Sequence, residues 1–182
     1  MAQIILNMKK INITVLFLLS SFIISCGFHL RGQQDLSTVL PEVQLQGANK
    51  HSETGRELIR HLTAAKVNVL DESDTVLIIS RNIFSKRVLS LDSAGRANQY
   101  GLSYQLGFSL VKREQSENTQ KIVDLIPAQT ISEKREYLFD ANLVLAKADE
   151  ESRLNNDMRQ AAMLQLMRRL SFLLKKTSLK KQ

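Results

Sequence analysis

The feature that most constrains the fold is a strict alternation of apolar with small or polar residues over residues 100–110. The apolar positions of this stretch are Tyr100, Leu102, Tyr104, Leu106, Phe108 and Leu110. Successive side chains of a β-strand point to opposite faces of a sheet. The pattern therefore predicts a strand whose sheet has one apolar face and one polar face.

A turn pattern lies just before this strand. Residues 92–95 read Asp-Ser-Ala-Gly, and Gly95 can adopt the positive φ that tight turns require. The preceding residues 75–91 are rich in β-branched and apolar side chains, which favours a second long strand. We therefore predict a long antiparallel hairpin over residues 75–111, whose end carries Arg96, with Lys86 and Arg87 farther down.

Shorter patterns predict the remaining strands. Residues 43–46 alternate between apolar and polar side chains and are followed by Gly47, which is typical of a half-buried strand. Residues 122–126 form a short apolar run closed by Pro127, which suits a sheet edge or the entrance to a strand. Residues 129–139 predict a charged final strand. The two strands of the hairpin, residues 43–46 and this final strand give four strands.

Two helices are predicted from apolar residues at helical spacing. The first runs from an N-cap at Ser52 to about Ala65, and Val67 and Val69 allow a short extended return after it. The second runs from about Ala148 to Leu174. Its apolar row is Leu154, Met158, Ala162, Leu166, Leu170 and Leu174. The predicted fold class is α+β, with a four-stranded, mostly antiparallel sheet packed against two helices.

The N-terminus has the three parts of a secretory signal. Lys9 and Lys10 precede an almost wholly apolar run over residues 11–24, and the small Ser25 follows it. The run spans 14 residues, whereas a membrane-spanning helix needs roughly 20. We therefore expect residues 1–25 to be a signal peptide and not a retained transmembrane anchor.

Cys26, the only cysteine, directly follows this segment. The sequence Ile-Ile-Ser-Cys resembles the lipobox of bacterial lipoproteins. The resemblance implies cleavage before Cys26, a thioether-linked diacylglycerol on its sulfur, and acylation of its new amino group by a fatty acid such as palmitate. A free thiol or an intermolecular disulfide is the alternative. With one cysteine the folded part has no internal disulfide, so it depends on packing.

Removal of the signal leaves 157 residues, enough for one domain over residues 26–174, followed by a basic tail over residues 175–182. The signal holds two lysines and no acidic residue, so its removal lowers the net charge from +7 to +5. This balance favours an anionic partner. Export argues against nucleic acid and for anionic lipid or glycolipid phosphate.

The sequence offers little for catalysis. The three histidines are scattered without metal-ligand spacing, and there is no G-x-S-x-G, P-loop or Gly-rich dinucleotide turn. The acidic pair Glu150-Glu151 lies at the expected helix start, where the helix dipole accounts for it. We expect no catalytic residue, no metal and no cofactor.

Three stretches together resemble the LptE family of lipopolysaccharide-assembly lipoproteins. Residues 26–31, Cys-Gly-Phe-His-Leu-Arg, are close to the start C-G-[WF]-x-L-R of that family. The hairpin ending in Gly95, followed by Tyr100 and the alternating strand, is the second stretch. The third runs over residues 139–147 into the long helix that contains residues 168–170, Arg-Arg-Leu.

The resemblance implies a four-stranded sheet with two helices and a non-enzymatic role. It implies a lipid-anchored protein of the cell outer membrane whose domain sits in the lumen of an LptD-like β-barrel, on the periplasmic side. In this heterodimer it would plug and help assemble the barrel. It would also bind lipopolysaccharide during transport to the outer leaflet.

The resemblance also indicates two ligand-binding residues. Lys147 matches the basic position that precedes the long helix in the family. At the hairpin turn Ser93 lies in register with the family's basic residue, and Arg96 follows three positions later. We expect Arg96 and Lys147 to hold lipopolysaccharide phosphates through charge-assisted hydrogen bonds. Simple solvation of both side chains is the alternative.

Two other classes of function remain open from the sequence. One is a stand-alone outer-membrane lipid-binding or structural lipoprotein without a barrel partner. The other is a lipoprotein hydrolase whose Ser–His–Asp triad assembles only in space. Recovery of the protein together with an outer-membrane barrel would separate the first of these from the LptE-like interpretation.

Overall fold

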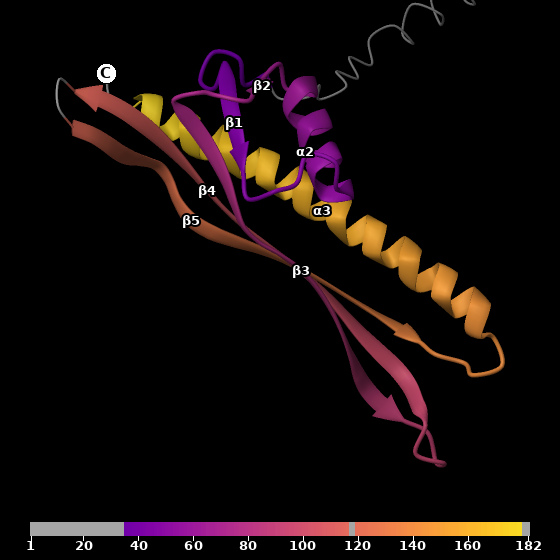
Figure 1. The fold of residues 1–182 in the computed structure, drawn as a ribbon. Helices are drawn as coiled ribbons and strands as arrows, with labels where there is room; N and C mark the ends of the chain where they lie inside the picture. Colours follow the sequence, from indigo (N-terminus) through magenta and orange to yellow (C-terminus); the bar gives the residue numbers. More distant parts are fainter. Residues whose placement is uncertain (1–34, 117–118, 180–182) are drawn as a thin grey trace, which may run out of the picture. The chain divides into compact units, whose positions relative to one another are not determined.

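The computed structural model describes residues 35–116 and 119–179, which form a five-stranded sheet and two helices (Figure 1). The strands are β1 (Glu42–Gln46), β2 (Asn68–Leu70), β3 (Thr75–Leu91), β4 (Ala97–Ser116) and β5 (Thr119–Leu138), and the helices are α2 (Glu53–Ala64) and α3 (Val144–Leu179). This arrangement confirms the α+β class. The predicted signal peptide and Cys26 lie outside the described residues.

The sheet is mixed, with strand order β2-β1-β3-β4-β5. Strand β4 is antiparallel to both of its neighbours, β3 and β5, whereas β1 runs parallel to both β2 and β3. The predicted count of four strands was one too low because β2 has only three residues. So short a segment cannot show an alternating pattern, although the sequence did allow an extended return at Val67 and Val69.

Strand β5 is one continuous element, whereas the sequence predicted a short run before Pro127 and a separate strand after it. Ile126 pairs with Leu110 and Gln129 with Phe108, so Pro127 and Ala128 sit at a register shift opposite Ser109. β5 is also the outer strand of the sheet. Proline is tolerated at a bulge on an edge strand because no neighbouring strand needs its missing N–H.

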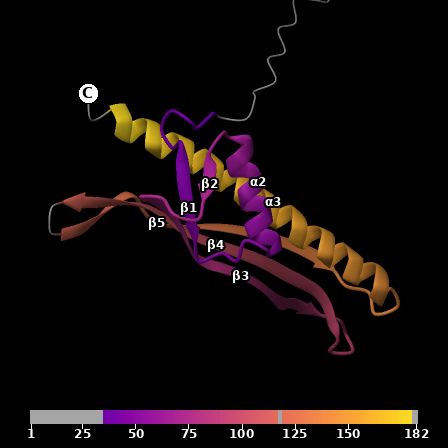
Figure 2. The same cartoon turned by 45° about the horizontal axis from the view of Figure 1, so that its top comes forward.

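The core lies between one face of the sheet and the two helices, which cover the same side of β3 to β5 (Figure 2). The apolar positions of β4 from Leu102 to Leu110 are at most 2% exposed. Facing them, the buried side chains of α3 are Met158, Ala162, Met163, Leu166, Leu170 and Leu174. Burial confirms the predicted strand face and most of the predicted helix row, while Leu154 is only partly buried.

Both helices form where the sequence predicted them, with different limits for α3. Ser52 caps α2, since its Oγ accepts a 3.0 Å hydrogen bond from the backbone N–H of Gly55. Helix α3 begins four residues before Ala148 and ends five residues after Leu174. Its lysine-rich end continues as helix because lysine has good helix propensity and basic side chains are favoured at a helix C-terminus.

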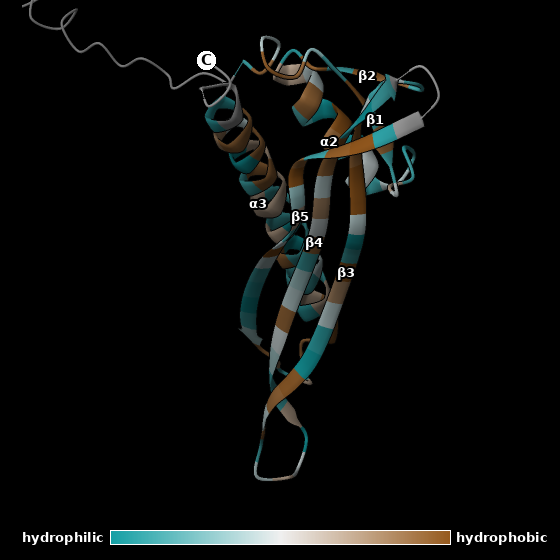
Figure 3. Cartoon of the chain, turned by 90° about the vertical axis from the view of Figure 1, so that its left-hand side faces the viewer, coloured by the Kyte–Doolittle hydropathy of each residue, from teal (hydrophilic) through white to brown (hydrophobic). Residues whose placement is uncertain are grey.

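The hairpin of β3 and β4 is confirmed, including its turn. Pairing runs from Thr75 opposite Lys112 to Leu91 opposite Ala97. Gly95 has a φ of +76°, as a turn of this kind requires. Figure 3 shows apolar and polar residues following one another in bands along the two strands.

β4 and β5 stay paired until Gln99 and Leu138. Beyond that pair the hairpin turn continues in one direction, while the chain turns through residues 139–143 into α3 (Figure 1). The backbone N–H of Phe139 donates to the carbonyl of Asn98 at 2.8 Å where the two paths separate. Neither described helix combines the length and hydrophobicity that crossing a membrane would need.

Candidate functional site

The two predicted binding residues line one pocket of about 400 Å³, which we call the fork pocket. It lies between the hairpin turn and the connection from β5 to α3. Its lining residues are Asp92, Arg96, Ala97, Asn98, Leu138, Phe139, Asp140, Ala141, Asn142 and Lys147. The fold therefore brings Arg96 and Lys147 to the same site, although they are far apart in the sequence.

Arg96 is positioned by the aspartate that begins the turn. Oδ1 of Asp92 accepts the backbone N–H groups of Ala94 and Arg96, both at 2.9 Å, and Oδ2 accepts Nε of Arg96 at 2.8 Å. The hydrogen bond from the backbone of Arg96 is the main cause that lowers the pKa of Asp92. The Arg96 side chain is 70% exposed, so it remains open to a ligand.

Lys147 is more enclosed than Arg96. Its side chain is 19% exposed, and its Nζ lies 2.8 Å from Oε2 of Glu150. The first turn of α3 contains no acidic residue, although a helix N-terminus favours negative charge. The cation Lys147 therefore opposes the preference of a helix N-terminus for negative charge. Departures of this kind are expected more often at functional sites than elsewhere.

The acidic residues of the fork pocket are used to build its turns. Asp92 holds the hairpin turn, and Oδ1 of Asp140 accepts the backbone N–H of Asn142 at 2.8 Å and its Nδ2 at 3.0 Å. These carboxylates thus bind backbone groups of their own loops. The arrangement places two cations from different elements around one space, each paired with a carboxylate, Arg96 with Asp92 and Lys147 with Glu150.

Beside the fork pocket, a polar and aromatic cluster joins the sheet to α3. Nζ of Lys86 lies 2.6 Å from Oε2 of Glu151 and 4.0 Å from the ring centre of Tyr100. The hydroxyl of Tyr137 donates to the same carboxylate oxygen at 2.6 Å. Tyr100 stacks on Tyr137 and meets Phe139 edge-on, with ring centres 5.7 and 5.4 Å apart. We call these five residues the Lys86 cluster.

Charge is retained within the Lys86 cluster. Burial opposes the charge of Lys86, but the interactions with Glu151 and Tyr137 outweigh it and raise the pKa of Lys86. Burial likewise opposes ionisation of Glu151, yet the hydrogen bonds from Lys86 and Tyr137 lower the pKa of that carboxyl group. Both groups are therefore ionised at neutral pH, and their pairing fixes the hairpin strands to the start of α3.

This role of Glu151 was not predicted from the sequence. The pair Glu150-Glu151 was attributed to the helix dipole, but α3 starts at Val144, so Glu151 lies beyond the first turn. The polar Lys86 stands opposite the buried Leu102 and therefore on the helix-covered face of the sheet. The one signal in the sequence for the contact between Lys86 and Glu151 was this basic residue opposite an apolar one.

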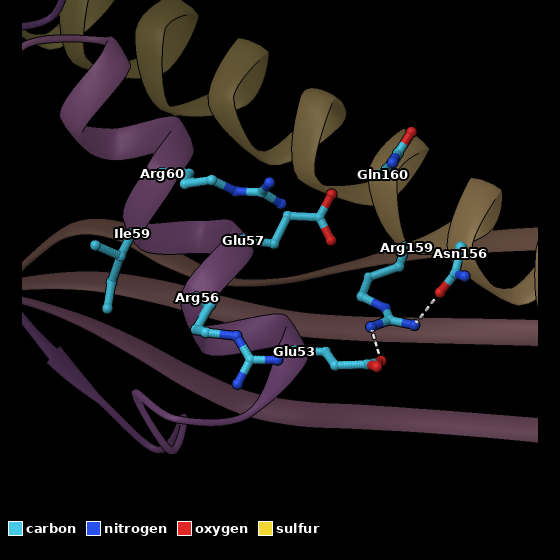
Figure 4. Close-up of a pocket in the computed structure, with 8 residues that line it drawn as sticks. All are labelled: Glu53, Arg56, Glu57, Ile59, Arg60, Asn156, Arg159 and Gln160. Atoms are coloured by element: carbon cyan, nitrogen blue, oxygen red, sulfur yellow. Dashed lines mark hydrogen bonds and ion pairs between the residues drawn. The ribbon is translucent and has the colours of Figure 1, made fainter.

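A larger pocket of about 610 Å³ lies between α2 and α3 (Figure 4). Among its lining residues, Arg159 of α3 is 13% exposed. Its guanidinium binds Glu53 of α2 and, at 2.7 Å, Oδ1 of Asn156 of its own helix. Through the contact with Glu53, Arg159 joins the two helices. No three metal-ligating side chains cluster within the described ranges.

The middle of the sheet face away from the helices is mostly polar, with Ile83 as an exposed apolar residue among polar ones. The small residues Gly101, Ser103 and Gly107 of β4 lie along it. Across it, Nη1 of Arg81 donates to Oε1 of Gln105 at 2.9 Å, and the hydroxyls of Ser85 and Ser103 lie 3.0 Å apart. This face suits contact with water or with another polar surface.

Comparisons with known proteins agree on one family. The LptE family model, described as lipopolysaccharide-assembly, matches residues 40–170. No curated protein sequence matches the chain. Rare lipoprotein B from Shewanella oneidensis is 24% identical, with a TM-score of 0.58, over 74% of this chain and 98% of that one.

Two further solved structures are similar. An uncharacterized lipoprotein B from Nitrosomonas europaea is 30% identical, with a TM-score of 0.59, over 80% of this chain and 90% of that one. A minor lipoprotein from Acinetobacter baumannii is 20% identical, with a TM-score of 0.55, over 72% of this chain and 90% of that one. Since the family model spans most of the chain and the fold agrees, the chain belongs to the LptE family of lipopolysaccharide-assembly proteins.

Proposed function

We propose that this protein is a non-catalytic subunit of lipopolysaccharide assembly that binds lipopolysaccharide at the fork pocket. The convergence of Arg96 and Lys147 on one pocket carries the proposal. Lipid A presents phosphate groups, and arginine and lysine bind phosphate through strong charge-assisted hydrogen bonds. Membership of a lipopolysaccharide-assembly family supports the choice of this ligand.

Binding requires an exchange of partners at both cations. Arg96 is paired with Asp92 through Nε, and Lys147 is paired with Glu150. Both pairs reach the solvent, since the side chains of Arg96 and Glu150 are 70% and 43% exposed, and ion pairs at a protein surface contribute little to stability. A phosphate that accepts two or three charge-assisted hydrogen bonds can therefore replace or share these contacts. The free backbone N–H groups at the start of α3 favour the same negative charge.

The proposal places the protein at the outer membrane, in the lumen of an LptD-like β-barrel that it plugs and helps to assemble. The polar sheet face supports this placement, because the lumen of a membrane barrel is polar and filled with water. Lipid attached to Cys26 would hold this protein, as one member of the heterodimer, at the membrane, since several acyl chains together anchor a protein stably.

The first test is binding of purified lipopolysaccharide to the full-length protein and to its Arg96→Glu/Lys147→Glu variant. We expect the double variant to bind at least about tenfold more weakly, because two attractive contacts become repulsive. Lys112→Glu/Arg113→Glu makes the same change of charge at exposed positions near the other end of β4, and it should bind normally. Equal binding by both variants at moderate salt would remove Arg96 and Lys147 from the site.

The second test separates the barrel partner from the stand-alone alternative. In mild detergent the protein should be recovered with an outer-membrane barrel at a fixed ratio. Recovery without any barrel would favour a stand-alone lipid-binding lipoprotein. A hydrolase would instead contain a serine or histidine whose substitution abolishes an activity while the protein stays folded.

A further inference from the structure

Exposed apolar side chains gather around the fork pocket. Half of the twelve large hydrophobic residues that the described part of the chain exposes lie at this end, and we call them the apolar rim: Val88, Leu91, Leu138, Leu143, Val144 and Leu145. Leu145 is 84% exposed and Leu138 62%. Single exposed leucines are ordinary on a protein surface, but a group at one site marks contact with an apolar partner.

The rim borders the two cations directly. Leu138 lines the fork pocket beside Arg96 and Lys147. On the hairpin side, Leu91 pairs with Ala97, another lining residue. On the helix side, the carbonyl of Leu143 accepts the backbone N–H of Lys147 at 2.9 Å. Residues of the apolar rim thus lie next to lining residues of the fork pocket on both its hairpin side and its helix side.

The rim is not needed to complete the core. The aromatic rings at this end, Tyr100, Tyr137 and Phe139, already pack on one another and on Lys86. Substitution of exposed residues such as Leu138 and Leu145 by glutamine should therefore change the stability of the fold little. The apolar character of the rim therefore indicates an apolar partner that covers it.

We infer that the apolar rim is an acyl-chain subsite: it binds the hydrocarbon chains of the same lipid whose phosphates Arg96 and Lys147 hold. This inference rests on the proposed function and adds the contact that selects an amphiphile over a soluble phosphate compound. A barrel wall fits the rim poorly, because the inner surface of a membrane barrel is polar. Adjacent cationic and apolar groups complement a phosphorylated head with chains attached to it.

The inference is tested by titrating the full-length protein with intact lipopolysaccharide and with fully deacylated lipopolysaccharide, which keeps its phosphates. Leu138→Gln/Leu145→Gln should weaken binding of the intact form by about tenfold and leave binding of the deacylated form unchanged. Leu164→Gln/Phe172→Gln alters exposed residues on α3 away from the pocket and should bind both forms as the wild type does.

Three results would overturn the acyl-chain subsite. The first is that the rim variant binds intact lipopolysaccharide as tightly as the wild type does. The second is that the rim variant loses affinity for the intact and the deacylated form equally. The third is that the wild type binds both forms with the same affinity. In all three cases binding by the wild type still supports the proposed function. Failure of the wild type to bind either form contradicts the proposed function itself.

A second measurement does not depend on the glutamine variants being folded. A photoreactive benzophenone amino acid is placed in cells at Leu145, at Asn142 in the fork pocket, or at Leu164 as the control. We expect Leu145 and Asn142 to capture lipopolysaccharide and Leu164 not to. Capture at Asn142 alone would refute the rim subsite but not the phosphate site, and capture of a protein at Leu145 would assign the rim to a protein partner.

Discussion

Lys86 and Glu151 show how single residues join the hairpin to the long helix. Their side chains are 36% and 25% exposed, so the pair is screened only in part. Lys86→Gln leaves the carboxylate of Glu151 with Tyr137 as its remaining donor. We expect the free energy of unfolding in urea to fall by about 1 kcal/mol.

Lys66→Gln is the matched control for this change. Lys66 pairs with Asp35 at 2.6 Å, but the two side chains are 70% and 46% exposed. A pair so open to water should contribute little to the free energy of unfolding. A loss on Lys66→Gln as large as the loss on Lys86→Gln would contradict the special role of the Lys86 cluster.

The same pair predicts how stability depends on pH. The pKa of Glu151 is lowered from its ordinary value of 4.5, so its contribution is complete above that value and is lost as pH falls through the folded-state pKa. The pKa of Lys86 is raised from 10.5, so its contribution is complete below that value and is lost as pH rises through the folded-state pKa.

The expected outcome is a plateau. The difference in unfolding free energy between wild type and Lys86→Gln should be constant between about pH 5 and pH 10 and should shrink on further acidification. Urea titrations at a series of pH values measure it. A difference that grows as the pH drops below 4 would show that the ion pair is not its source.

At the scale of elements, the buried row of α3 holds the helix on the sheet. Leu166 is fully buried, whereas Leu164 on the same helix is 49% exposed. Leu166→Ala should reduce the free energy of unfolding by about 2–5 kcal/mol, since it removes buried methyl groups and leaves a cavity. Leu164→Ala should change it by less than about 0.5 kcal/mol. Similar losses from both would mean that α3 is turned about its axis.

The elements could be predicted where a pattern is long. The alternation from Tyr100 to Leu110 and the row from Met158 to Leu170 each repeat often enough to identify their structure, and burial confirms both. Sequence patterns did not predict the elements whose structure depends on pairing with a neighbouring strand. Strand β2 exists because it pairs with β1, and Pro127 is tolerated because β4 accepts a register shift there.

At the scale of the whole molecule, the site depends on contacts that no local pattern encodes. Spacing in the sequence says nothing of the distance between Arg96 and Lys147. They share a pocket because β5 stops pairing at Leu138 while the hairpin continues, and because the Lys86 cluster ties α3 to the same strands. Family resemblance supplied the two residues, and the fold supplied their common pocket.

The proposed function depends above all on binding of lipopolysaccharide phosphates at the fork pocket. The most direct measurement compares the affinities of the full-length wild type and of Arg96→Glu/Lys147→Glu for intact and for dephosphorylated lipopolysaccharide. Removal of the phosphates should weaken binding to the wild type by at least about tenfold and should change the affinity of the double variant little. Dephosphorylation and the double substitution remove the same interaction, so their effects do not add. Equal losses of affinity in both proteins would place the phosphates elsewhere and contradict the claim.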